Sequence, residues 1–379
     1  MKKILLIFFC LFSQSLFSQK MHNAVENFNS INVSALSKYT DKKHIFVGEC
    51  HLDKTNTLFQ SVITSYYLRN GFNALVIERG YGESYLLTKA IKEKDKKLIK
   101  KIGYWDIWID ENLYFNIMDS LSLLSIPPPK IIGIDYEQSF ELTKMALNDI
   151  FTSCGLVKDA SEQDSSNYIL DFDKNTLKLF YNDTIIHYYH LINHFEDYST
   201  QSVDSMYNDL VNNSNRYKSL FKDKYDDAVR CLISFKMMRY SNCRDAKNVT
   251  SCYNEREKLL YKNFVEFVEN DSLRSIGLFG YRHILKKYIP CDGYMFNYAP
   301  FVSQLCELKN NIASFFPFYD FRSYKNWIIK DPEVFMDINK YLLLKSKMPK
   351  KSFVIFEQPK DGNWELNRSL YDLIIISGK

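Results

Sequence analysis

Short apolar runs, two of which end at an acidic residue, recur along the chain and predict the strands of one sheet. The seven runs are 44–48, 74–78, 130–135, 275–280, 312–319, 352–356 and 371–376. Runs of this length that are apolar on both sides of the strand are typical of a parallel sheet covered by helices.

Helical spacing separates the first two runs. Leu58, Val62 and Tyr66 recur at intervals of four, and Asn70-Gly71 supplies a helix C-cap, so we predict a helix over 57–69. The charged run 92–101 predicts a solvated helix face after the second strand.

The middle of the chain carries no run of the strand type. Residues from about 140 to 269 show helical patterns rich in Asn, Asp, Tyr and Lys. We therefore predict an α/β fold with a mostly parallel central sheet flanked by helices and a large helical insertion, or cap. Residues 20–379 would form a single α/β domain that contains this insertion.

The first nineteen residues have the order of a secretory signal peptide. Lys2 and Lys3 precede an apolar segment over 4–12, and small and polar residues suited to cleavage follow over 13–19. No later apolar run reaches the roughly 18 residues of a membrane helix. We predict an exported protein, periplasmic or secreted, with no stable membrane span.

The charge balance limits the classes of partner that the protein can bind. The chain has 49 basic and 45 acidic residues, a net charge of +4. Nucleic-acid binding over an extended face would require a concentrated basic excess, so we expect no nucleic-acid partner.

Seven cysteines remain after the signal peptide, which leaves at least one thiol free in a monomer. Cys243 and Cys252 lie in a polar connecting stretch, where they could pair in an oxidising compartment. The other interpretation is that most cysteines are small buried apolar residues.

Polar side chains stand at the carboxyl ends of the first strands, where open α/β sheets bind ligands. The first strand is followed by Glu49 and His51, which are two residues apart and therefore point to the same side of an extended chain. The second and third end at Glu78 and Asp135, and the fourth is followed by Arg282 and His283.

Two kinds of chemistry fit these residues. A neutral histidine can act as a general base while a carboxylate fixes its tautomer, or imidazole and carboxylate groups can bind a divalent metal. The spacing does not choose between them. Neither G-x-S-x-G nor H-E-x-x-H occurs, so a serine nucleophile has no support in the sequence.

Two further clusters allow a functional and a structural interpretation each. His187, His190 and His194 share one helical face, which fits metal or haem ligands, a substrate-facing wall, or the boundary of an amphipathic helix. Trp105 and Trp108 fit either the lining of an apolar pocket or ordinary core packing.

The order of these pieces resembles the erythromycin esterase-like proteins and their relatives, the haem-binding iron-regulated lipoproteins and the Tiki-type metalloproteases. The matching pieces are Val47-Gly48-Glu49-Cys50-His51, Leu75-Val76-Ile77-Glu78, Gly133-Ile134-Asp135, Asn254-Glu255-Arg256-Glu257 with Asn263, Gly280-Tyr281-Arg282-His283, and Leu370 to Ile374. Each piece is short, and their order over most of the chain carries the resemblance.

The resemblance implies a hydrolase that cleaves an ester or related bond of a small-molecule substrate without a covalent enzyme intermediate. The four catalytic residues that it implies are Glu49, His51, Glu78 and His283. The four substrate-binding residues that it implies are Arg256, Arg282, Asn263 and Asp135. His51 would activate water, Glu49 or Glu78 would orient it, and His283 or Arg282 would stabilise the oxyanion.

One departure keeps alternatives open. The esterase pattern has two residues between Glu and His, whereas here Cys50 alone separates Glu49 from His51, as in the haem-binding lipoproteins. The alternatives are a haem- or metal-binding protein that uses His51 and the His187 face, or a non-catalytic cell-envelope protein that keeps the fold. The hydrolase itself requires no cofactor, while a divalent metal or haem is the cofactor of the first alternative.

Overall fold

The computed structural model describes most of the chain. The described residues are 35–49, 51, 56–106, 109–155, 200–240, 243, 246–287, 299–308, 311–318, 353–357 and 371–377. The predicted signal peptide lies outside them. No helix among the described residues is long and apolar enough to cross a membrane.

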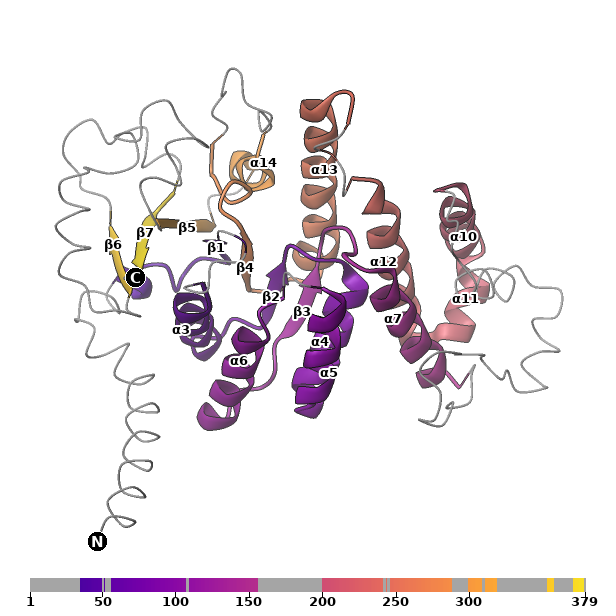
Figure 1. Ribbon diagram of the computed structural model, residues 1–379, viewed down its shortest axis with the longest axis horizontal. Helices are drawn as coiled ribbons and strands as arrows, with labels where there is room; N and C mark the ends of the chain where they lie inside the picture. Colours follow the sequence, from indigo (N-terminus) through magenta and orange to yellow (C-terminus); the bar gives the residue numbers. More distant parts are fainter. Residues whose placement is uncertain are drawn as a thin grey trace, which may run out of the picture. The chain divides into compact units, whose positions relative to one another are not determined.

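Seven strands form one sheet, and each corresponds to a run predicted from the sequence (Figure 1). They are β1 (His44–Glu49), β2 (Ala74–Ile77), β3 (Lys130–Gly133), β4 (Ser275–Gly280), β5 (Ile312–Phe318), β6 (Phe353–Glu357) and β7 (Leu373–Ser377). Their order in the sheet is β3-β2-β4-β1-β5-β7-β6.

The sheet is mostly parallel. Strand β1 pairs in parallel with β4 and β5, and β5 pairs in parallel with β7, while β6 runs antiparallel to β7. Every residue of β2 and β4 is buried, as expected for strands that are covered on both faces. The predicted α/β class with a mostly parallel, helix-flanked sheet is confirmed.

Helical segments accompany the strands within the described residues. They are α3 (Asn56–Arg69), α4 (Tyr81–Glu93), α5 (Lys96–Trp105), α6 (Glu111–Leu124), α7 (Phe140–Ser153), α10 (Thr200–Asn212), α11 (Ser214–Phe221), η1 (Lys222–Lys224), α12 (Tyr225–Lys236), η2 (Met237–Tyr240), α13 (Val249–Phe264) and α14 (Phe301–Leu308). A π-helical turn, η4 (Val265–Glu269), follows α13.

The chain divides into two compact units. The first comprises Met1–Leu75, Asn112–Pro129 and Val268–Lys379, and the second comprises Val76–Glu111 and Lys130–Phe267. The described residues from 140 to 269 are helical apart from short connections. A single domain with a helical insertion stays a prediction.

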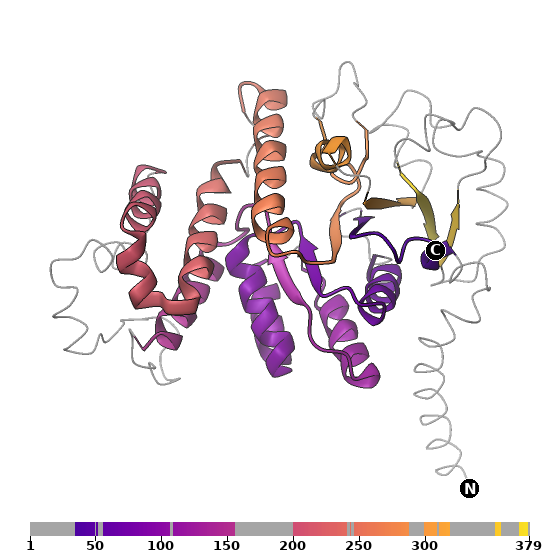
Figure 2. The ribbon, with the colours of Figure 1, turned by 180° about the vertical axis from the view of Figure 1, so that it is seen from behind.

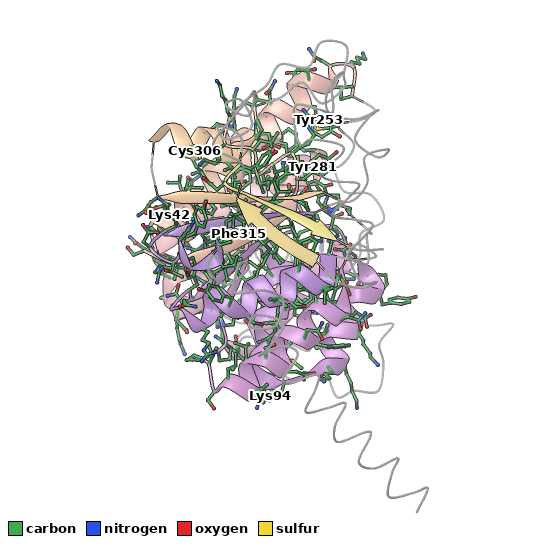
Figure 3. The ribbon with its side chains drawn as sticks, turned by 90° about the vertical axis from the view of Figure 1, so that its left-hand side faces the viewer. Lys42, Lys94, Tyr253, Tyr281, Cys306 and Phe315 are labelled. Atoms are coloured by element: carbon green, nitrogen blue, oxygen red, sulfur yellow. A yellow bond between two sulfur atoms is a disulfide. The ribbon has the colours of Figure 1, made fainter. Side chains whose placement is uncertain are left out.

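Aromatic packing forms the core of the first unit. Phe46 of β1 contacts Phe301 of α14 and Phe279 of β4, with ring centroids 5.6 and 6.1 Å apart. Gly277 makes room for this packing, because a Cβ there would lie 2.4 Å from Phe46 Cδ1. Phe315 of β5, labelled in Figure 3, is fully buried and packs against the ring of Tyr67 at 6.0 Å.

Helix α3 was predicted correctly. Of the three residues whose spacing predicted it, Val62 is buried, Tyr66 is half-buried and Leu58 is 36% exposed, whereas Phe59, Ile63 and Tyr67 are fully buried. Both sets recur every four residues, so spacing alone could not tell which set is buried more deeply. The helix ends at Arg69, and Gly71 adopts a φ of 84° in the predicted C-cap.

Helices dominate the second unit. Helix α4 packs against β3, α5, α7 and α12, and α10 packs against α12. The pairing of α4 with α5 can be followed from both sides of the ribbon (Figures 1 and 2).

A disulfide joins Cys243 to Cys252 in the first turn of α13. The sequence left this pairing open. Asn248 caps the same helix by accepting a hydrogen bond from the Ser251 N–H at 3.0 Å. The N-terminal end of α13 is therefore held by a covalent bond and by a side-chain cap.

Candidate functional site

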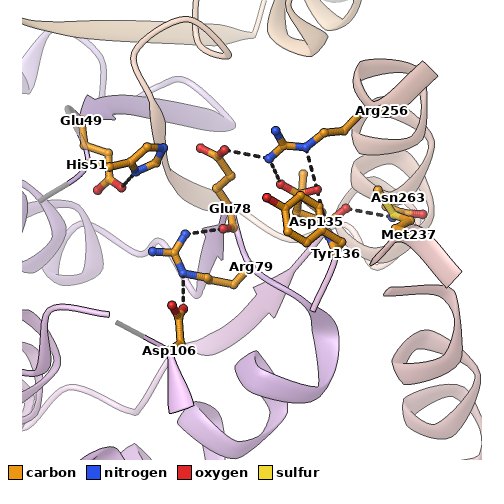
Figure 4. A network of polar contacts seen from close by, with 11 residues as sticks. Glu49, His51, Glu78, Arg79, Asp106, Asp135, Tyr136, Met237, Arg256 and Asn263 are labelled. Carbon is orange, nitrogen blue, oxygen red and sulfur yellow. Dashed lines mark hydrogen bonds and ion pairs between the residues drawn. The ribbon is translucent and has the colours of Figure 1, made fainter. Parts of the chain in front are cut away.

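Glu49, His51 and Gln60 form a hydrogen-bonded group in the first unit. Glu49 is the last residue of β1, and its Oε1 lies 2.9 Å from His51 Nδ1 (Figure 4). On the other side of the carboxylate, Gln60 of α3 donates from Nε2 to Glu49 Oε2 at 2.8 Å. The predicted meeting of Glu49 with His51 is observed, while Gln60 was not predicted.

This arrangement assigns the histidine tautomer. An ionised carboxylate only accepts hydrogen bonds, so Nδ1 of His51 carries the proton and Nε2 carries the lone pair of the neutral ring. The His51 side chain is 36% exposed and that of Glu49 is 16% exposed. An oriented imidazole that solvent can reach is the arrangement a general base requires.

The carboxyl end of β4 lies beside that of β1. Gly280 is the register partner of Glu49, and the Tyr281 N–H donates to the Glu49 carbonyl at 2.9 Å. Arg282 and His283 follow within three residues, and His283 is buried with 5% exposure. The sheet thus brings the polar sequences that follow β1 and β4 to one edge, as predicted.

Arg256, Asp135 and Glu78 form a second group, the Arg256 cluster, within the second unit (Figure 4). The guanidinium of Arg256 donates from Nε to Asp135 Oδ1 at 3.0 Å, from a terminal nitrogen to Asp135 Oδ2, and to Glu78 Oε1 at 2.9 Å. Its side-chain exposure is 9%, against 6% for Glu78 and 0% for Asp135. Paired donors that face paired acceptors make this a strong, directional interaction.

The charge state of Arg256 is secured by this pairing. Burial by itself lowers the pKa of the guanidinium, but Asp135, Tyr136 and Glu78 outweigh that effect and hold its pKa well above the ordinary value. The Tyr136 ring also lies 4.8 Å from the guanidinium carbon. Three of the predicted site residues are therefore joined in a buried ionic cluster.

Local backbone geometry places Asp135 in the Arg256 cluster. A Cβ on Gly133 would lie 2.1 Å from the Gly80 carbonyl oxygen, so the end of β3 meets the turn after β2 backbone to backbone. The Asp135 N–H then donates to the Arg79 carbonyl at 2.9 Å. Asn263 of α13 donates to the Ile134 carbonyl at 2.8 Å, which ties the same segment to that helix.

The predicted site residues thus fall into two groups that are described separately. Glu49, His51, Arg282 and His283 belong to the first unit, and Glu78, Asp135, Arg256 and Asn263 belong to the second. The predicted convergence of Glu49, His51, Glu78 and His283 on one pocket stays a prediction.

A buried acid cluster in the second unit had no counterpart in the sequence prediction. Glu83, Asp106 and Glu137 are at most 1% exposed, and Arg79 forms an ion pair with Asp106 at 2.8 Å. Burial, followed by the charge of Asp106, raises the pKa of Glu83 well above its usual range. Burial also raises the pKa of Glu137 to about 8. The hydrogen bonds that its carboxylate accepts from the Gly82 and Glu83 N–H groups lower the pKa and so oppose this rise.

The acid cluster fixes the start of α4. Gly82 N–H donates to Glu137 Oε1 at 2.5 Å and Glu83 N–H donates to Oε2 at 3.3 Å, so Glu137 caps a helix to which it does not belong. Gly80 admits this carboxyl group, because a Cβ there would lie 2.2 Å from Glu137 Cδ. The only hint in the sequence was that Glu137 closely follows the third strand.

The remaining candidates have different outcomes. His187, His190 and His194 lie outside the described residues, as does Trp108. Trp105 is 41% exposed, so a core position does not describe it, and the lining of a pocket stays a prediction. Within the described residues, no three His, Cys, Asp or Glu side chains are arranged to hold a metal ion.

The chain is an α/β protein with a mostly parallel sheet, and several solved structures have a similar fold. A variant of the erythromycin esterase EreC in its open conformation matches the chain with a TM-score of 0.56 and 13% identity, over 91% of this chain and 93% of that one. A succinoglycan biosynthesis protein matches with a TM-score of 0.53 and 14% identity, over 91% and 90%. A Bacillus cereus protein matches with a TM-score of 0.53 and 11% identity over the same shares.

These likenesses show that the chain shares the fold of these proteins, and the predicted resemblance is confirmed at that level. No family model and no curated protein sequence matches the chain.

Proposed function

We propose that the protein is an exported hydrolase of the erythromycin esterase-like type, with His51 as the general base. The observation that carries the proposal is the hydrogen-bonded order Gln60–Glu49–His51, in which the carboxylate fixes the imidazole with Nδ1 protonated. The likeness of the fold to an erythromycin esterase supports the same class of reaction.

The reaction begins when Nε2 of His51 accepts a proton from water. The resulting hydroxide adds to the carbonyl carbon of an ester or lactone, and the carbonyl oxygen becomes an oxyanion. When the intermediate collapses, the carbon–oxygen bond to the leaving group breaks and the alkoxide takes the proton held by His51. Glu49 stabilises the imidazolium between these steps.

Arg282 and His283 are our candidates for stabilising the oxyanion, because they follow the strand that pairs with β1. The Arg256 cluster has a different role in this proposal. Its guanidinium is occupied by Asp135 and Glu78, so it holds the segments after β2 and β3 in place.

The test is hydrolysis of a panel of p-nitrophenyl esters and macrolide lactones by the purified chain. We expect His51→Asn to lower kcat/KM by about 10² to 10⁴, the usual contribution of a general base. Glu49→Gln should lower it as well and shift its pH profile, while Lys38→Gln, at an exposed position of the same unit, should leave it unchanged. Full activity of the His51→Asn variant would refute the mechanism.

Mass spectrometry of the protein during turnover tests the absence of a covalent intermediate. We expect only the unmodified mass, because water attacks the substrate directly. An acyl adduct would require a nucleophile that the proposal does not contain. If none of the panel is hydrolysed by the wild-type chain, the non-catalytic alternative gains.

A further inference from the structure

Helix α5 has an exposed face that differs in composition from its buried face. Its ten residues, K-K-L-I-K-K-I-G-Y-W, include four lysines and no acidic residue. Ile99 and Ile102 are fully buried and anchor the helix, which packs against α4 and α7. The six residues on the opposite side are all exposed, and we call them the α5 face: Lys96, Lys97, Lys100, Lys101, Tyr104 and Trp105.

Helical spacing arranges the α5 face in two parallel rows. Lys96, Lys100 and Tyr104 are four residues apart, and the second row repeats the order with Lys97, Lys101 and Trp105. Each row therefore places two ammonium groups on the N-terminal side and an aromatic ring at the C-terminal end. Over these ten residues the helix extends about 15 Å.

The aromatic end of the α5 face is strongly exposed. Tyr104 is 76% exposed, the highest value among the large apolar side chains of the described residues, and Trp105 is 41% exposed. Their rings contact each other edge to face at 5.1 Å. Contact of two adjacent aromatic rings with water is unfavourable, so a partner that covers them would gain free energy from removing this apolar surface from water.

The basic end of the face is continued by the turn before it. Lys94, labelled in Figure 3, links α4 to α5 with a φ of 57° and is exposed, as is Lys92. Asp95 directly precedes α5, and its carboxylate is used in the cap of the helix, where it accepts hydrogen bonds from the Lys97 and Leu98 N–H groups. Glu93, between Lys92 and Lys94, is exposed. Among the described residues, Lys97, Lys100 and Lys101 take part in no ion pair.

We propose that the α5 face is a docking surface for an anionic phospholipid membrane. Lysine ammonium groups attract the negative surface, and each contributes about 1 kcal/mol close to it. Tyrosine and tryptophan settle at the level of the headgroups, where one part of the ring is apolar and another is hydrated. The protein would lie on the membrane without entering it, because the apolar side of α5 is already buried against the protein.

A nucleic acid is the less suitable partner. The six residues lie on one short helix, whereas the whole chain has an excess of only four positive charges. Such a small patch neutralises few phosphates, while a fluid lipid surface can enrich anionic headgroups beneath it. This inference is independent of the hydrolase proposal.

The test is binding of the purified chain to vesicles of mixed phosphatidylglycerol and phosphatidylcholine, compared with phosphatidylcholine alone. We expect binding to the anionic vesicles only, and a loss of affinity in high salt because the lysine contribution is screened. Lys97→Gln/Lys101→Gln should weaken binding by about 10- to 30-fold, from about 1 kcal/mol for each lysine.

The matched control is Lys258→Gln/Lys262→Gln, which removes two exposed lysines at the same spacing from helix α13. It should change the affinity by less than about twofold, because these lysines are far from the α5 face along the chain and belong to another helix. An equal loss in both double variants would overturn the docking surface and leave only non-specific attraction to charge.

Tryptophan fluorescence tests the aromatic end without relying on charge. On anionic vesicles, emission should shift to shorter wavelengths and be quenched by brominated lipid, and Trp105→Phe should remove most of both changes. Leu123→Ala, which removes another exposed apolar side chain, should remove neither. No binding to vesicles, equal binding to neutral vesicles, or binding to heparin alone would each refute the proposal.

Discussion

The Glu49–His51 pair and the Arg256 cluster use the same kinds of residue in opposite surroundings. Both join carboxylates at strand ends to a cationic or basic side chain, yet the His51 side chain is 36% exposed whereas the Arg256 side chain is 9% exposed. In the exposed pair each contact is weak and the imidazole can exchange protons with water. In the buried cluster each charge depends on its partners, because removing one leaves the others without compensation in a medium of low polarity.

The difference in exposure distinguishes residues that can take part in a reaction from residues that support the structure, although both kinds look alike in the sequence. A group that transfers a proton must be accessible to its substrate, and His51 is accessible. Asp135 has no exposed surface, and its role is to fix the Arg256 guanidinium. The following predictions test this contrast, in order of decreasing effect on the free energy of unfolding.

The largest effect is expected for Arg256→Met. It leaves Asp135 and Glu78 buried without their cation, which should lower the free energy of unfolding by about 3–5 kcal/mol. Urea denaturation measures the change. The control is Lys258→Met on the same helix, which removes a cation whose side chain is 64% exposed and should cost under about 1 kcal/mol. Equal losses would contradict the contrast.

The next effect is expected for Cys252→Ser, which removes the disulfide at the start of the helix that carries Arg256. Opening this short loop should cost about 2–3 kcal/mol. Amide hydrogen exchange should increase in α13 and remain unchanged in α3, which carries Gln60. The matched control is Cys154→Ser, at a free thiol that donates to the Phe221 carbonyl, a bond that serine can keep.

The buried acid Glu137 should make stability depend on pH. Its pKa is about 8 in the folded protein, against 4.5 for the ordinary group, so the folded state binds more protons between these values. The free energy of unfolding should therefore fall as the pH rises from about 4.5 to about 8.

The comparison of wild type with Glu137→Gln across this pH range isolates the effect. The variant lacks the titrating carboxyl group, so its stability should fall less steeply in that window. Gln can still accept one of the two hydrogen bonds from the start of α4. Parallel pH profiles of the two proteins would show that Glu137 ionises in the folded state without cost.

The smallest effect on stability is expected for His51→Ala. The side chain is partly exposed and its contact with Glu49 is not enclosed, so the free energy of unfolding should change by less than about 0.5 kcal/mol. Hydrolysis, measured on the same preparation, should nevertheless be lost under our proposal. A large loss of stability would place His51 with the Arg256 cluster as a structural group.

The sequence predicted the sheet well for a physical reason. The buried strands of a parallel sheet consist of apolar residues on both faces, so each appears as an uninterrupted run, and all seven predicted runs are strands. The spacing of Leu58, Val62 and Tyr66 predicted helix α3 but not its most deeply buried residues, because Phe59, Ile63 and Tyr67 have the same spacing. Packing against the rest of the protein buries the second set fully, and it buries Val62 of the first set as well.

The contact between two particular side chains of the site was predicted only where it is local. Glu49 and His51 meet because they are two residues apart, whereas Arg256 contacts Asp135 across 121 positions of the chain. Gln60 is a polar residue among the apolar residues of a helix, which is the one sign of a special role in the sequence. That sign can be interpreted only when the buried face of the helix is known. The acid cluster had only one weak signal, the position of Glu137 shortly after the third strand, because single glutamates and aspartates usually lie in solvent.

The backbone contact between Gly133 and Gly80 has a consequence for how related sequences will be interpreted. Every replacement that one nucleotide change can make at the Gly133 codon introduces a Cβ, and the 2.1 Å approach to the Gly80 carbonyl oxygen leaves no room for one. Descendants of this gene should therefore keep glycine at position 133 even if the chemistry of the protein changes. Invariance at that codon would record the closeness of two main-chain segments, not selection for a substrate.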